Sequence, residues 1–170
     1  MTSSRRTATV VGLLFLTQTV AFIIAEQLIG GVLKAPDYLT TVAAHADALT
    51  LGALFAVVSG VAVVGIAVLL FPLLKRTSEP LALGYVCERV VELVLQIVFF
   101  MVTPLLIIAI GHGLRDGTLD AATSQSLAQL MSLHDVAIVV LYLVTSVGGT
   151  ILAVLLYRSQ LVSRWLAVWG

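Results

Sequence analysis

Four apolar segments, each long enough to cross a lipid bilayer, constrain this chain more than any other feature. They cover residues 7–30, 48–70, 81–111 and 136–157. A transmembrane helix needs about 20 mostly apolar residues, because the hydrocarbon core is about 30 Å thick. Backbone polar groups in lipid must be satisfied within the segment, which favours helices. The sequence therefore predicts an all-α, polytopic transmembrane helical bundle, forming a single domain over residues 1–170.

The composition agrees with a membrane protein and excludes a nucleic-acid partner. Of the 170 residues, 60% are hydrophobic and 11% are charged, whereas about 25% of the residues of a soluble domain are charged. The formal net charge is zero, and Lys and Arg are adjacent at most in pairs. Nucleic-acid binding would need a basic patch. The expected partner is the lipid bilayer, together with either a second copy of the chain or another membrane subunit.

The distribution of basic residues predicts the orientation of the chain. One predicted side of the membrane carries Arg5, Arg6, Lys75, Arg76, Arg158 and Arg164, and the other carries only Lys34 and Arg115. Cytoplasmic segments are enriched in Lys and Arg. The amino terminus of this multi-pass protein is therefore predicted to be cytoplasmic.

Three further predictions concern the ends and irregularities of the helices. Residues 120–133 have an apolar and a polar side, which indicates a helix lying at the membrane interface. Pro104 is predicted to kink the third span, because proline cannot donate the helical hydrogen bond. Residues 165–170 resemble the start of a fifth span that follows the four full ones.

A polar stripe lies inside the third apolar segment and consists of Tyr85, Glu88, Arg89, Glu92 and Gln96. On a helix, residues four apart share a face, so Glu88, Glu92 and Gln96 lie together. Ionisable residues at membrane depth usually face the bundle interior and often mark transport sites. One guanidinium cannot neutralise two carboxylates, which leaves one acid to titrate or to bind a cation. The first hypothesis is a site that binds or moves a small polar solute or ion.

The alternative explanation of the same stripe is structural. Ion pairs and amide contacts also hold transmembrane helices together. In that case Arg89 and one glutamate stabilise the bundle. The protein would then be a structural or interaction subunit of a membrane assembly.

A second group of polar residues falls at the outer ends of the predicted spans: His45, Asp47, His112, His134 and Asp135. Three imidazoles with carboxylates would suffice for zinc, which in catalytic sites takes three protein ligands and a water. A membrane-embedded, metal-dependent hydrolase is therefore a further alternative. The spacing matches no local zinc motif, however, and histidine at a membrane boundary commonly exposes its polar tip to water. No cofactor is predicted for the first hypothesis.

Catalytic residues are not predicted. The sequence contains no Gly-rich phosphate loop, no Ser-His-Asp order and a single cysteine, Cys87. Candidate nucleophiles such as Ser59 and Ser146 have no base beside them in the sequence. Enzymatic activity therefore has no support from motifs.

Several short motifs together carry a resemblance to a known family. They are Arg5-Arg-Thr-Ala8, the stretch from Tyr38 to Leu49, Phe71-Pro-Leu-Leu-Lys-Arg76, Ala82-Leu-Gly-Tyr-Val86 with Arg89 and Glu92, and Arg164-Trp-Leu-Ala-Val-Trp-Gly170. As a set they resemble the bacterial membrane-protein family catalogued as domain of unknown function 4386, over nearly the whole chain. The resemblance implies a bacterial cell membrane as the location. Members are typically longer, with further spans, which implies that this chain is truncated; no activity is implied.

Overall fold

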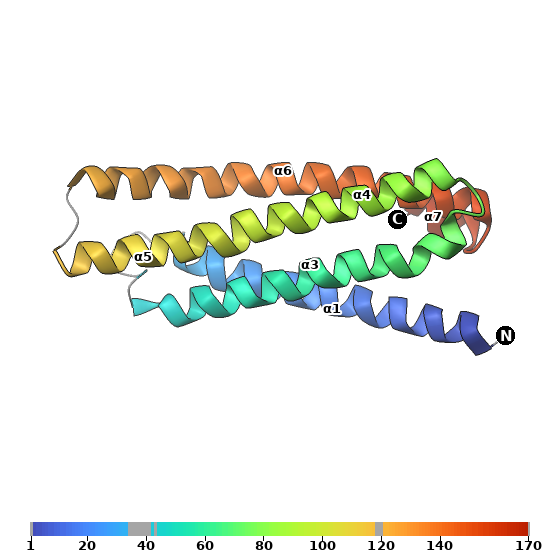
Figure 1. Ribbon diagram of the computed structural model, residues 1–170, viewed down its shortest axis with the longest axis horizontal. Helices are drawn as coiled ribbons and strands as arrows, with labels where there is room; N and C mark the ends of the chain where they lie inside the picture. The colour runs from blue at the N-terminus through green and yellow to red at the C-terminus, as the bar shows by residue number, and fades with distance from the viewer. Residues whose placement is uncertain (1, 34–41, 43, 118–120, 170) are drawn as a thin grey trace.

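The computed structural model describes residues 2–33, 42, 44–117 and 121–169, and nearly all of them are helical (Figure 1). The elements are α1 (Thr2–Leu33), α3 (Ala46–Leu74), α4 (Glu79–Gln96), the π-helix η1 (Ile97–Val102), α5 (Thr103–Arg115), α6 (Ala121–Ser159) and α7 (Arg164–Trp169). Helices α4, η1 and α5 follow one another without a break. These residues include no strand, so the all-α prediction is confirmed.

Four helical stretches are long and apolar enough to cross a membrane: Arg5–Leu33, Ala46–Leu74, Glu79–Gly113 and Val136–Ser159. Each contains one predicted span and extends slightly beyond it. Large apolar side chains such as Leu16, Leu54 and Leu143 are exposed on the outside of the bundle. Lipid tails can cover such side chains, whereas a water-soluble monomer rarely exposes large contiguous apolar surfaces. The chain is a multi-pass helical bundle.

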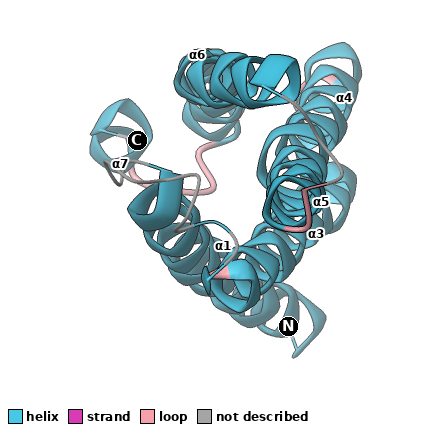
Figure 2. Cartoon of the chain, turned by 90° about the vertical axis from the view of Figure 1, so that its left-hand side faces the viewer, coloured by secondary structure: helices cyan, strands magenta, loops and turns pink. Residues whose placement is uncertain are grey.

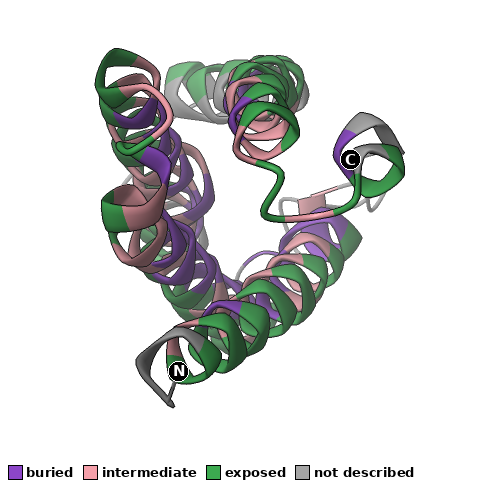
Figure 3. Cartoon of the chain, turned by 90° about the vertical axis from the view of Figure 1, so that its right-hand side faces the viewer, coloured by how far each residue is buried: buried purple, intermediate pink, exposed green. Residues whose placement is uncertain are grey.

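The long helices pack in chain order, α1 against α3, α3 against α4 and α4 against α6 (Figure 2). One apolar core joins residues of α1, α3, η1, α5 and α6 around Ile29, Phe100 and Leu141. A second core, around Leu74, Tyr85 and Leu155, joins α3, α4 and α6. Buried residues therefore line the inner side of the helices, and exposed ones lie outside (Figure 3).

Glycines on α3 allow neighbouring helices to approach closely. A Cβ atom at Gly52 would lie 2.8 Å from Cγ1 of Ile29 on α1, and one at Gly60 would lie 2.5 Å from Cδ1 of Leu93 on α4. Small residues serve this purpose in membranes, where packing rather than the hydrophobic effect holds helices together.

One local prediction needs revision. Residues 121–133 are not a separate interface helix, because α6 runs unbroken from Ala121 to Ser159. This stretch contains neither Gly nor Pro, and Ala, Leu and Gln favour helix continuation. The kink predicted at Pro104 stays a prediction. Just before this residue lies the π-helix η1, and Thr103 Oγ1 donates to the carbonyl oxygen of Val98 at 3.0 Å. A π turn is wider than an α turn and accommodates a break in the hydrogen-bond ladder. Residues 165–169, the predicted start of a fifth span, lie in α7.

Candidate functional site

Helix α4 places the polar stripe in the interior of the bundle. Tyr85, Arg89, Glu92 and Gln96 are buried, and the side chain of Glu88 is only 9% exposed. Their three- and four-residue spacing puts them on one side of the helix. The opposite side carries apolar residues that are exposed, namely Val90, Val91 and Val94. The amphipathic pattern of α4 therefore has its charged side inward, the reverse of a helix in a water-soluble protein.

Arg89 contacts both carboxylates of the stripe. Its Nη1 donates a hydrogen bond to Oε2 of Glu92, and its Nε lies 3.2 Å from Oε2 of Glu88. The second contact lacks hydrogen-bond geometry, so both Glu88 oxygens remain without a hydrogen-bond partner among the described residues. The guanidinium also lies over the ring of Tyr85, 5.1 Å from its centroid. Two carboxylates thus share one cation, and Glu92 has the better-aligned contact.

Gly148 of α6 makes room for the carboxylate of Glu88. A Cβ atom at this position would overlap the Glu88 carboxylate. The neighbouring Gly149 has no atom within 4 Å of an added Cβ. The Glu88 carboxylate is therefore held between its own helix and the backbone of α6.

The side chain of Gln96 lies next to Gly60 of α3, just as Glu88 lies next to Gly148 of α6. A Cβ at Gly60 would lie 2.9 Å from Oε1 of Gln96, and this oxygen has no hydrogen-bond partner among the described residues. Ser59, next to Gly60 in the sequence, is fully buried, and its Oγ is likewise unpartnered within the described part of the chain. Most buried polar side-chain atoms in proteins are hydrogen-bonded to protein groups or ordered water, so these two oxygens are exceptions.

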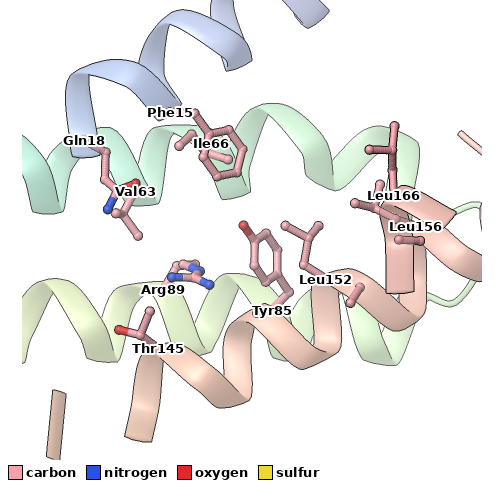
Figure 4. A pocket seen from close by; sticks show the side chains of 13 residues that line it. Phe15, Gln18, Val63, Ile66, Tyr85, Arg89, Thr145, Leu152, Leu156 and Leu166 are labelled. Carbon is pink, nitrogen blue, oxygen red and sulfur yellow. The ribbon is translucent and has the colours of Figure 1, made fainter. Parts of the chain in front are cut away.

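A cavity of about 300 Å³ adjoins the stripe (Figure 4). Its wall contains Arg89 and Tyr85 of α4, Gln18 of α1 and Thr145 of α6. The remaining wall is mostly apolar and includes Phe15, Ile66, Leu152, Leu156 and Leu166. In Figure 4 the side chains of Gln18, Arg89 and Thr145 gather at one end, and Leu152, Leu156 and Leu166 at the other. The cavity therefore has a polar end and an apolar end.

A larger groove of about 1000 Å³ shares part of this wall. Arg89, Thr145 and Gly149 line both spaces. The groove continues along α6 and reaches Tyr157 and Arg158. Arg89 therefore lies where the cavity and the groove meet.

The sequence alone does not single out Gln18 and Thr145 as site residues. Each is a polar residue within an apolar span, and such residues frequently make contacts between helices. That signal is weak on its own, because Thr17, Thr19 and Ser146 carry it equally. Only the packing of α1 against α3, and of α4 against α3 and α6, selects the residues that reach the cavity.

The residues proposed as zinc ligands are only partly described. His45, Asp47 and His112 are exposed. No group of three or more His, Cys, Asp or Glu that could hold a metal occurs among the described residues. The side chains of His134 and Asp135 lie outside the described part of the structure, so the zinc site formed by the five residues stays a prediction.

Fold and site together define the class: an all-α, multi-pass membrane protein with a buried charged cluster on one span. The chain belongs to the family described as Domain of unknown function (DUF4386), whose model matches residues 10–170. This confirms the family predicted from the motifs. No curated protein and no solved structure matches the chain.

Proposed function

We propose that this protein binds a small polar solute or ion within the membrane, in the cavity beside Arg89, and exchanges it with one membrane face. The observation that carries the proposal is that Arg89 belongs both to the buried charged cluster and to the cavity wall. A charged side chain at the bilayer centre costs about 2.5–3.5 kcal/mol on insertion scales. An ion pair that served only to hold helices together would gain nothing from an adjoining cavity.

The size and lining of the cavity favour a small ligand. At about 300 Å³ it is at the lower end of the range of about 300–1,000 Å³ typical of ligand pockets. Gln18, Thr145 and the Tyr85 hydroxyl offer hydrogen bonds near Arg89, while leucines line the other end. A solute with a polar head and a short apolar body fits this lining best.

The groove along α6 supports a route to the membrane surface. It leads from Arg89 past Ser146 and Thr150 to Arg158, near the end of α6. These residues let a polar solute keep hydrogen-bond partners along the way. The route ends at the same end of the bundle as the amino terminus (Figure 1).

That end of the bundle is proposed to be cytoplasmic, in a bacterial cell membrane. Arg5 and Arg6 lie near the start of α1, Lys75 and Arg76 in the turn between α3 and α4, and Arg158 at the end of α6. These three places share one end of the bundle (Figure 1). The excess of basic residues there supports a cytoplasmic position.

Cysteine accessibility tests whether the cavity admits polar solutes. Cys87 is exposed, so Cys87→Ser provides the background. In proteoliposomes, Thr145→Cys on the cavity wall should react with a small charged methanethiosulfonate. Val147 is exposed on the outside of the bundle within the span Val136–Ser159, where lipid is expected to cover it, so Val147→Cys should not react. Small amines, carboxylates and amides are then screened for protection of Thr145→Cys. If Thr145→Cys is as inert as Val147→Cys, the binding function is wrong and the structural-subunit alternative is favoured.

A further inference from the structure

We propose that Glu88, Arg89 and Glu92 together hold one exchangeable proton, and that Glu88 is the carboxyl that takes it up and releases it. The proposal concerns the contact between α4 and α6. It does not depend on what occupies the cavity beside Arg89.

The net charge of the cluster favours the uptake of one proton. With both acids ionised, the cluster has two negative charges and one positive charge, and all three side chains are at most 10% exposed. Arg89 is the only basic residue within residues 7–30, 48–70, 81–111 and 136–157, the predicted spans. No neighbouring span can therefore supply a second cation. An uncompensated charge in a low-dielectric interior is costly, and uptake of a proton removes it.

The surroundings of Glu88 likewise favour its protonation. On its own helix the groups near it are Tyr85, Arg89 and Glu92, and from α6 it meets the backbone at Gly148. Within residues 136–157 of α6 the titratable side chains are Tyr142 and Tyr157, and residues 48–74 of α3 have none. In α1 the single acid or base beyond Arg6 is Glu26. The other basic residues of α1 and α6 are Arg5 and Arg6 in the first turns of α1 and Arg158 in the last turn of α6. Within the ranges given, nothing offers Glu88 a second positive charge.

The available space favours a proton over a metal cation. A metal ion needs several oxygen ligands around it, whereas the Glu88 carboxylate lies so close to α6 that a single Cβ at Gly148 would overlap it. Neither carboxylate oxygen is accessible or hydrogen-bonded among the described residues. A proton needs no additional space, and a protonated carboxyl becomes a hydrogen-bond donor.

Glu88 rather than Glu92 is assigned as the carboxyl that exchanges the proton, because the two acids contact Arg89 differently. Glu92 accepts a hydrogen bond from Nη1, while Glu88 has only the misaligned contact with Nε at 3.2 Å. The ionised form of Glu92 is therefore the better stabilised of the two. Because the two acids interact through one guanidinium, the proton belongs to the cluster as a whole.

Infrared difference spectroscopy of the full chain in lipid, between about pH 5 and about pH 9, tests the count of protonated carboxyls. The wild type should show one protonated-carboxyl band from the cluster. Glu88→Gln and Glu92→Gln should each abolish it, since one acid then faces one guanidinium. Arg89→Gln should increase it about twofold, because two acids then lack a cation. Glu79→Gln, at the exposed start of α4, should leave it unchanged, and Glu26→Gln identifies any band due to Glu26.

Each outcome decides the proposal. Loss of the band in both glutamine variants supports it, even if Arg89→Gln fails to fold. The proposal is overturned if the wild-type spectrum shows no protonated-carboxyl band that disappears in the Glu88→Gln variant. If that band is absent and Na⁺ or K⁺ stabilises the wild type at constant pH but not the Glu88→Gln variant, the site binds a metal cation instead. None of these outcomes changes the result expected from cysteine labelling of the cavity, which tests the proposed function separately.

Discussion

At the scale of single residues, Gly148 lies so close to Glu88 that one added methyl group would meet the carboxylate. Gly148→Ala should destabilise the protein by about 1–3 kcal/mol, the usual cost of overpacking, because the new methyl group overlaps the Glu88 carboxylate. Gly149→Ala is the matched control. Its Cβ meets no atom within 4 Å, and alanine is favoured over glycine in a helix by about 0.8–1.0 kcal/mol. Unfolding free energies in mixed micelles provide the comparison.

A double variant separates this contact from a general effect on α6. Glu88→Ala shortens the side chain that Gly148→Ala would strike, so the double variant should recover most of the stability lost by Gly148→Ala. If Gly148→Ala and Gly149→Ala behave alike, or if the double variant is no more stable than Gly148→Ala, Glu88 does not occupy this position.

The members of the stripe can be placed together from the sequence because helical spacing fixes which residues of α4 share a face. The sequence could not determine that Arg89 contacts both acids, since that depends on a side-chain rotamer. Nor could it pair Glu88 with Gly148, which lies on another helix. The pair Gly148-Gly149 suggested close packing but not what packs against it.

At the scale of elements, both α1 and α4 pack against α3, and Gly52 is a point of close approach between α3 and α1. Gly52→Ala should lower the unfolding free energy by about 1–3 kcal/mol, because the added Cβ would lie 2.8 Å from Ile29 Cγ1 and 3.2 Å from Leu28 Cβ. Neither atom is the free end of a flexible chain. Gly31→Ala, on α1 with no atom within 4 Å, is the control. Equal stability of the two variants would argue against this helix contact.

The spans themselves were predictable because length and hydropathy decide whether a helix can cross a membrane. Whether a helical stretch joins the neighbouring span was not predictable. An amphipathic pattern over residues 120–133 is compatible both with an interface helix and with an extension of α6. Likewise, Pro104 indicates an irregularity, but its form as a π-helix depends on how the surrounding turns adjust.

At the scale of the whole molecule, the cavity is assembled from helices distant in the sequence. Residues of α1, α3, α4, α6 and α7 contribute to its wall. Amphipathicity constrains which side of a helix faces inward, but the order and offset of the helices decide which inward residues meet. That is why Tyr85 and Arg89 could be proposed from the sequence, whereas their neighbours Gln18 and Thr145 could not.

The orientation of the whole bundle is the final prediction. The amino terminus should be cytoplasmic and residues 121–133 should lie at the opposite end, because basic residues concentrate at the first of these ends. In a Cys87→Ser background, Ser124→Cys should be labelled by a membrane-impermeant maleimide in intact cells, and Ser3→Cys only after the cells are opened. Adding lysines next to Ser124 provides a control, since enough of them should weaken or reverse the charge bias. Labelling of Ser3→Cys in intact cells would show that the orientation is the reverse of the predicted one, with the α6 groove at the outer face.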